Sequence, residues 1–89
     1  MVLPIQYTPA AARDIRALRR IPEAQRNRIR EAIEELARNP TPQGAIQIRG
    51  GAPGERRVRV GDYRIRYQVT ENPKAILITR VRHRREVYR

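Results

Sequence analysis

The chain has 89 residues, which is enough for one small domain with a modest hydrophobic core. It contains no cysteine, phenylalanine or tryptophan, which excludes disulfides and thiolate metal sites and leaves the core mainly to isoleucine, valine, leucine and alanine. Its 20 basic and 9 acidic residues give a net charge of +11, and so large a surplus favours a polyanionic partner.

The positive charge is concentrated in the second half of the sequence. Residues 1–43 hold eight basic and five acidic side chains, whereas residues 44–89 hold twelve and four. Only Lys74 is a lysine, and every other basic residue is an arginine, whose planar guanidinium group can hold a phosphate through two hydrogen bonds. We therefore expect the anion-binding surface in the second half.

The first ten residues carry no charged leader, and the sequence has no apolar run long enough to span a membrane. Together with the absence of cysteine, this predicts a soluble protein of the cytoplasm with no membrane partner.

The first predicted elements are a strand and a helix. Val2 to Tyr7 is typical of a short strand, and Pro4 favours a place at a sheet edge. Thr8 followed by proline is a helix-start signal, which predicts a helix from about Pro9 to Arg20. Its apolar stripe comprises Ala11, Ile15 and Leu18.

A second helix is predicted between Pro22, which opens it, and Asn39, where asparagine and proline end it. Its apolar stripe comprises Ile29, Ala32, Ile33 and Leu36. The glutamates and arginines at its other positions are most simply interpreted as a solvated face, since ion pairs between successive helical turns are ordinary.

After residue 44 the apolar period changes from helical to two. This predicts four strands, Ala45–Arg49, Arg56–Val60, Tyr63–Thr70 and Ala75–Arg82. Gly61-Asp62 predicts a tight hairpin between the second and third of them. The order β-α-α-β-β-β-β predicts one α+β domain over residues 1–89, with a helical hairpin packed on one face of a mainly antiparallel, twisted sheet.

Arginines alternate with apolar residues along two of these strands. Arg57 and Arg59 point to one face of their strand, as do Arg64 and Arg66 on the next strand, and the apolar residues point to the other. Antiparallel pairing would bring the four guanidinium groups within a few ångströms, where like charges repel unless an anion binds between them. The alternative is a sheet edge that is protected from aggregation by charge.

The lone histidine lies in a basic segment near the end of the sequence. His83 is flanked by Arg82, Arg84 and Arg85, and histidine is the side chain that changes charge near neutral pH, so we expect it to be a general base. The alternative is a surface histidine that stacks on RNA or has no role. One histidine and scattered carboxylates predict no metal site, and no glycine-rich nucleotide loop is present, so no cofactor is expected.

Three segments resemble the RelE branch of the RelE/ParE toxin superfamily, namely Ile48-Arg49-Gly50, the strand Tyr63–Val69 and the closing segment His83–Arg89. The resemblance covers nearly the whole chain. It implies a RelE-like fold and a metal-independent endoribonuclease toxin that cleaves messenger RNA in the ribosomal A site. It also implies three partners, which are the ribosome, the messenger RNA and an acidic RelB-like antitoxin that is partly disordered when free.

The resemblance also assigns roles by position. Arg57 and Arg59 match two basic residues before the hairpin, and Arg64 matches the arginine of the Tyr-Arg strand. Arg84, with Arg82 as the alternative, matches the basic residue before the terminal tyrosine, which is Tyr88. Tyr88 would stack on or orient a nucleotide, or alternatively pack against the sheet. Where the family has lysine, arginine cannot accept a proton near neutral pH and can only stabilise charge.

These interpretations divide the candidate residues into two groups. The catalytic candidates are Arg57, Arg59, Arg64, His83, Arg84 and Tyr88. The RNA-binding candidates are Arg56, Arg66, Arg82 and Arg85. Two other functions remain open, a ParE-like protein that inhibits DNA gyrase without being an enzyme and an RNA-binding protein without catalysis.

Overall fold

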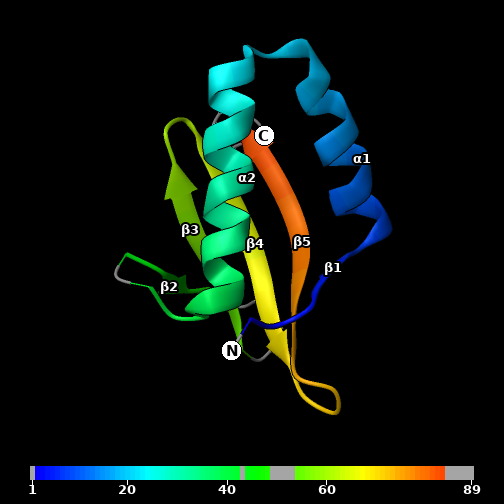
Figure 1. The fold of residues 1–89 in the computed structure, drawn as a ribbon, viewed down its shortest axis with the longest axis vertical. Coiled ribbons are helices and arrows are strands. Elements are labelled where there is room, and N and C mark those ends of the chain that lie inside the picture. Colours follow the sequence, from blue (N-terminus) through cyan, green and yellow to red (C-terminus); the bar gives the residue numbers. More distant parts are fainter. Residues whose placement is uncertain (1, 43, 49–53, 84–89) are drawn as a thin grey trace.

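The structure is a computed structural model that describes residues 2–42, 44–48 and 54–83. The elements in chain order are β1 (Ile5–Tyr7), α1 (Pro9–Ala17), a 3-10 helix (Leu18–Arg20), α2 (Glu23–Arg38), β2 (Ile46–Gln47), β3 (Glu55–Val60), β4 (Tyr63–Thr70) and β5 (Ala75–His83). They form one five-stranded sheet with the order β1-β5-β4-β3-β2. Both helices lie on the same side of this sheet (Figure 1).

The predicted α+β fold is confirmed, with one parallel strand pair in it. β1 runs parallel to β5 at one edge of the sheet, and every other neighbouring pair is antiparallel. The two edge strands are shorter than predicted, since β1 begins at Ile5 and β2 covers only Ile46 and Gln47. β5 extends one residue further than predicted, to His83.

The first helix begins where the sequence predicts. The Thr8 hydroxyl accepts a hydrogen bond from the Ala11 backbone N–H at 3.1 Å, which caps the helix, and Pro9 fills the first helical position. The same hydroxyl lies 3.0 Å from the Thr79 carbonyl oxygen and donates to it. One side chain thus starts α1 and attaches that start to β5.

The core lies between the sheet and the two helices. Its fully buried large side chains are Ile29 and Leu36 of α2 and Ile65, Tyr67, Ile76 and Ile78 of the sheet. The Tyr67 hydroxyl is not left without a partner, because it donates to the Pro40 carbonyl oxygen at 2.7 Å. No described helix is long and apolar enough to cross a membrane.

Two backbone features set the register of the central strands. The hairpin between β3 and β4 turns at Gly61 and Asp62, as predicted, and Gly61 has a φ of 58°, which glycine adopts without steric cost. Between β4 and β5 the register shifts, because Arg66 pairs with Arg80 but Tyr67 pairs with Ile78. Thr79 is therefore an extra residue in β5, as in a β-bulge.

The bulge changes which side chains of β5 face the helices. Ile76 and Ile78 point into the core, and a regular strand would send residues 80 and 82 the same way. The extra residue reverses the alternation, so that Val81 is buried instead. The side chains of Arg80 and Arg82 consequently leave β5 on the side opposite the buried Val81.

Candidate functional site

Six arginines project from the face of the sheet that the helices leave uncovered. Register neighbours form two rows across β3, β4 and β5, with Arg59, Arg64 and Arg82 in the first row and Arg57, Arg66 and Arg80 in the second. We call these six residues the arginine face. Neighbours within a row have Cα atoms about 5 Å apart, and the rows lie about 7 Å apart along the strands. The predicted clustering of the arginines of β3 and β4 is confirmed.

The arginine face borders a solvent-open hollow of about 640 Å³. It is lined by Ile46, Gln47, Ile48, Arg57, Arg64, Arg66, Arg80 and Arg82. Five arginine side chains therefore line one space, and Ile46 of β2 with the following Ile48 forms its apolar side. Guanidinium groups in this arrangement are suited to binding phosphate oxygens.

Glu55 supplies a carboxylate within this cationic surface. It lies two residues before Arg57 on β3 and therefore on the same side of the sheet. Its Oε1 lies 2.6 Å from Nη2 of Arg66, and its side chain is only 10% exposed. This ion pair holds the Arg66 guanidinium group against β3.

Asp14 connects helix α1 to the same surface. Its Oδ2 accepts a hydrogen bond from the Val81 backbone N–H at 2.9 Å and lies 3.0 Å from Nε of Arg80. Its Oδ1 accepts a second bond from Nη2 of Arg80 at 3.2 Å. The aspartate therefore satisfies a backbone group of β5 beside the bulge and fixes the outer end of the second row.

Two arginines of β3 differ from these paired residues. Arg57 and Arg59 form no ion pair with any residue in the described part of the chain. Because like charges at this spacing repel one another, the surface around them is stabilised when an anion binds.

Comparison with known proteins identifies the family. The model of the ParE toxin of type II toxin-antitoxin system, parDE, matches residues 5–88. This chain belongs to the RelE/ParE superfamily of type II toxins. It is 29% identical over 79 residues to the toxin RelE1 of Methanocaldococcus jannaschii, a match that spans 86% of this chain and 88% of that protein.

Solved structures agree with this RelE-like assignment. The RelB-RelE antitoxin-toxin complex from Methanococcus jannaschii is similar with 29% identity and a TM-score of 0.69, over 93% of this chain and 94% of that chain. The toxin-antitoxin complex RelBE2 from Mycobacterium tuberculosis is similar with 25% identity and a TM-score of 0.74, over 93% of this chain and 99% of that chain.

Two predicted site residues of the toxin lie on the other side of the sheet. Arg56 is the register partner of the buried Tyr67, on the face that the helices cover. His83 is the register partner of Tyr63, and their rings meet edge to face with centroids 5.3 Å apart. The alternation that directs Arg57 and Arg82 outward directs their neighbours Arg56 and His83 inward. The structure therefore does not bring these two residues together with the arginine face.

The remaining predicted residues divide by position. Arg57, Arg59, Arg64, Arg66 and Arg82 all belong to the arginine face. Arg84, Arg85 and Tyr88 lie outside the described residues. No group of three or more histidine, cysteine or acidic side chains that could hold a metal ion occurs among the residues that the structure describes.

Sequence reasoning missed three components of the toxin's site. Arg80 could have been found, because it precedes Arg82 by two positions and shares its side of the strand. Glu55 also stands in alternation with the arginines of its strand. Asp14 gave no such signal, because its contact with Arg80 spans 66 residues of sequence.

Proposed function

We propose that this toxin is a metal-independent endoribonuclease that cleaves messenger RNA in the ribosomal A site and so inhibits translation. The observation that carries the proposal is the pair of arginine rows on the open face of the sheet. An A-site codon is single-stranded, and its phosphates would meet fixed positive charges there. The RelE-like relatives add support, because their fold and chain length are similar.

The reaction we propose is an internal transfer at one phosphate. The ribose 2′-oxygen forms a bond to the adjacent phosphorus, the bond from phosphorus to the 5′-oxygen breaks, and the products are a cyclic phosphate and a 5′-hydroxyl. The attacking hydroxyl gives up its proton, and the leaving oxygen gains one. Negative charge grows on the non-bridging oxygens as the new bond forms, and preorganised cations lower the energy of that state.

Five of the six arginines of the face have a proposed part in this reaction. Arg57, Arg59 and Arg64 stabilise the charge that develops on the phosphate, because they converge from two adjacent strands. Arg66 and Arg82 hold the flanking RNA backbone. Guanidinium groups stay protonated near neutral pH, so none of these residues accepts the proton of the 2′-hydroxyl. Arg84 and Tyr88 keep their proposed catalytic roles, and Arg85 its proposed RNA contact, on the family resemblance.

The test is expression of the toxin in a bacterium, followed by mapping of messenger RNA 5′ ends against the reading frame. Wild type should produce cuts in phase with codons inside translated regions. Arg64→Ala should lower cleavage by about 10²-fold or more, since single stabilising donors commonly contribute that much. Its unfolding free energy should fall by no more than about 1 kcal/mol.

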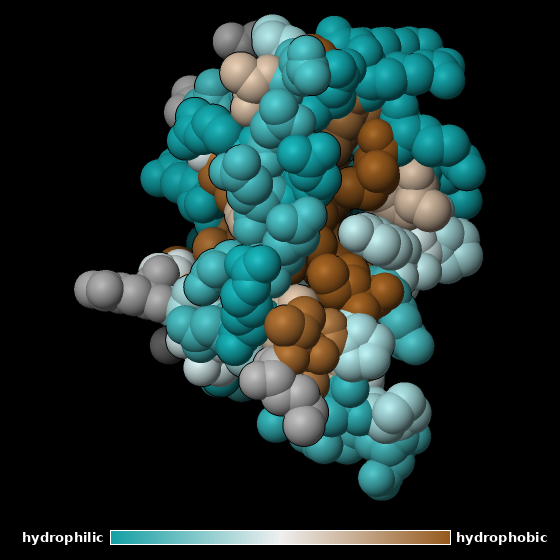
Figure 2. All heavy atoms as spheres, in the orientation of Figure 1, coloured by the Kyte–Doolittle hydropathy of each residue, from teal (hydrophilic) through white to brown (hydrophobic). Residues whose placement is uncertain are grey.

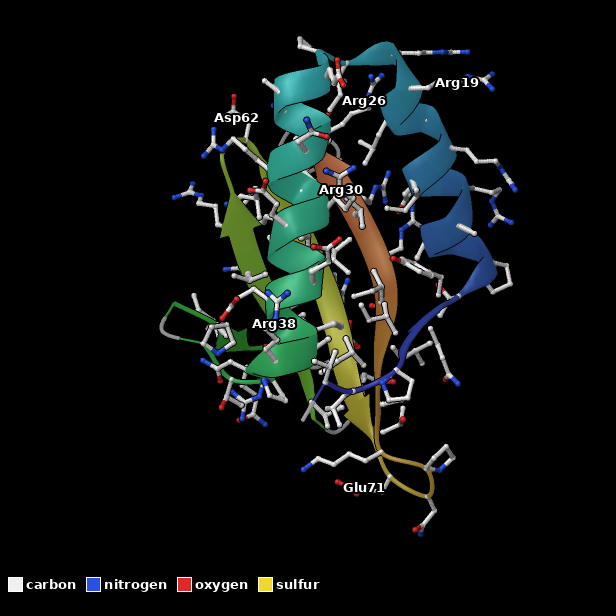
Figure 3. The ribbon with its side chains drawn as sticks, in the orientation of Figure 1. Arg19, Arg26, Arg30, Arg38, Asp62 and Glu71 are labelled. Atoms are coloured by element: carbon white, nitrogen blue, oxygen red, sulfur yellow. The ribbon has the colours of Figure 1, made fainter. Side chains whose placement is uncertain are left out.

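Two control variants make this test specific. Arg38→Ala removes an arginine from the outward side of α2 (Figure 3) and should leave cleavage unchanged. His83→Ala removes the predicted general base, and we expect cleavage to persist because the imidazole lies across the sheet from the arginines. Equal loss of folding and cleavage in Arg64→Ala would make that residue structural and contradict the proposal.

We further propose that the partner of this toxin is an acidic antitoxin. The net charge of +11 favours such a partner, and the two solved structures compared with this chain are complexes with antitoxins. Apolar side chains are also exposed between α1 and α2 (Figure 2), where a hollow of about 460 Å³ is lined in part by Tyr7, Ile15 and Ile33. An amphipathic antitoxin helix would cover this surface.

A second candidate function follows from the family model that matches the chain. That model describes ParE toxins, so a ParE-like inhibitor of DNA gyrase is the alternative. Such a protein would need neither Arg84 nor Tyr88, and a double substitution of both residues would leave its toxicity intact. DNA breaks that depend on gyrase, without cuts in messenger RNA, would favour this function.

A further inference from the structure

Two isoleucines lie directly beside the arginine face. Ile46 of β2 is the register partner of Arg57, and the N–H of Ile48 donates to the Glu55 carbonyl oxygen at 3.0 Å. Both side chains therefore point to the same side of the sheet as the arginines. Ile46 is 55% exposed, which is a high fraction for a large apolar side chain, and both isoleucines line the hollow of about 640 Å³.

We propose that Ile46 and Ile48 form a base-binding shelf, on which one nucleobase of a single-stranded RNA lies flat while its phosphate contacts the arginine face. The inference rests on the proposed function, because it requires RNA on this side of the sheet. It adds a binding site for the base, which the arginines alone do not supply.

The neighbourhood of the shelf matches a nucleotide, in which an apolar base and a charged phosphate are joined through one sugar. Ile46 and Arg57 are register partners, and their Cα atoms lie about 5.5 Å apart. Apolar surface and guanidinium group are thus within reach of a single nucleotide. Unstacked bases of single-stranded RNA need such a surface to cover their faces.

A peptide helix fits the shelf less well. Helices that dock in grooves present apolar anchors over two or more turns, at positions i, i+3, i+4 and i+7. The shelf offers only two side chains, Ile46 of β2 and Ile48 directly after it, and both are bordered by five arginines of the hollow. The hollow between α1 and α2 suits a helix better, because its apolar lining comes from several residues, Tyr7, Ile15, Leu18, Ile29 and Ile33.

The shelf would select a base by contact area. Isoleucine side chains form no hydrogen bonds, so they cannot read the edge of a base. A purine covers more of the two side chains than a pyrimidine does. We therefore expect a purine to be preferred at the nucleotide that occupies the shelf.

The first test is binding of a short fluorescent single-stranded RNA across a series of salt concentrations. Ile46→Ala should weaken binding about fivefold at every concentration, since it removes part of one apolar surface that the base covers. The slope of log affinity against log salt should not change, because isoleucine displaces no counterion. Arg57→Ala should instead make that slope shallower by about 0.7 for each phosphate that the variant no longer neutralises.

Two matched variants control for indirect effects. Ile46→Leu keeps the apolar area and should keep wild-type affinity. Val2→Ala shortens another exposed apolar residue, 64% exposed, whose neighbour Leu3 bonds to Ala37 of α2, and should have no effect. Unchanged affinity in Ile46→Ala, or a change in its salt slope, would overturn the shelf.

The second test uses RNAs in which one nucleotide at a time lacks its base. Wild type should lose about fivefold in affinity at a single position, and Ile46→Ala should lose nothing further there. This result without any cleavage on the ribosome would support the shelf and refute the proposed enzyme function. Failure of wild type to bind single-stranded RNA would overturn the shelf, whereas the enzyme function is decided separately by the mapped messenger RNA 5′ ends.

Discussion

At the scale of single residues, two carboxylates determine how the arginine face is held. Glu55 and Asp14 each bind one guanidinium group of the second row, and both carboxylates are largely buried, with side chains 10% and 14% exposed. They fix Arg66 and Arg80 in place and neutralise part of the positive charge of the arginine face. Arg57, between Arg66 and β2 in the same row, has no such partner in the described residues and keeps its full charge for a ligand.

Substitution of Glu55 tests this role. Glu55→Gln keeps the shape of the side chain but removes its charge, so the bond to Arg66 weakens. We expect the unfolding free energy to fall by about 1 kcal/mol, because Arg66 is partly exposed and the pair is partly screened. RNA affinity should rise with a steeper salt dependence, because the charge of Arg66 is then no longer partly neutralised by a carboxylate and binds phosphate more strongly.

Urea unfolding and RNA binding over a salt series would measure these effects. The control is Glu34→Gln, which removes an exposed ion pair with Arg30 at 3.9 Å and should change stability by less than about 0.5 kcal/mol. Equal effects of the two variants on RNA binding would show that Glu55 does not regulate the arginine face.

At the scale of elements, the strand β4 joins the core to the candidate site. Its alternate residues Tyr63, Ile65 and Tyr67 are buried against the helices, while Arg64 and Arg66 occupy the centre of the arginine face. Tyr67 also anchors the segment after α2, because its hydroxyl donates to the Pro40 carbonyl oxygen. The packing of this tyrosine on the helix side of β4 therefore supports the strand that carries Arg64 and Arg66 on its other side.

The titration of Tyr67 provides a test of this support. Burial raises the pKa of Tyr67 above its ordinary value of 10.0, and the charge of Arg56 opposes this only in part. A raised pKa means that the folded state favours the protonated hydroxyl, so its contribution to stability is present below about pH 10 and is lost as the pH rises through the folded pKa.

Tyr67→Phe should therefore have opposite consequences in the two pH ranges. Near pH 7 it should lower the unfolding free energy by about 1 kcal/mol, since the Pro40 carbonyl loses its donor. Above about pH 10 it should reduce the alkaline loss of stability. Urea unfolding at the two pH values measures both effects, and parallel pH profiles for the two proteins would contradict the role of Tyr67. The pKa of Tyr7 is also raised, first by burial and then by Glu34. Because Tyr7 is present in both wild type and Tyr67→Phe, its titration cancels when the two pH profiles are compared.

At the scale of the whole molecule, the two helices cover one side of the sheet (Figure 1), and the arginine face lies on the other side. The net charge of +11 opposes compaction through self-repulsion, most strongly where arginines are adjacent on three strands. Folding and anion binding are therefore coupled, because any anion that screens the arginine face also stabilises the fold.

Salt should for this reason stabilise the free toxin. Raising the salt concentration should increase the thermal midpoint by a few degrees, since 1 kcal/mol corresponds to about 4–8 °C in a domain of this size. The double variant Arg57→Gln/Arg59→Gln should have a higher thermal midpoint than wild type at low salt. Its midpoint should then rise less than that of wild type as salt is added. Thermal unfolding at several salt concentrations measures this.

A matched variant separates local crowding from total charge. Arg16→Gln/Arg20→Gln removes the same charge from exposed positions of the helical layer. The rise of its thermal midpoint with salt should stay close to that of wild type. Identical behaviour of the two double variants would show that net charge alone determines the response.

The sequence by itself determined the local structure, because local signals act over a few residues. Thr8 and Pro9 place the start of α1, and Gly61 and Asp62 place the central hairpin. The alternation in β3 and β4 also determined that Arg57, Arg59, Arg64 and Arg66 share one face.

Only the tertiary structure decided how β5 joins that face, and which carboxylates hold it. The bulge at Thr79 reverses the alternation of β5, which brings Arg80 and Arg82 out to the arginines and turns His83 toward Tyr63. Asp14, far away in sequence, then meets Arg80 beside the bulge. Period-two patterning fixes the relative faces of residues within one strand. The register between strands and the packing of helices decide which strand faces become one surface.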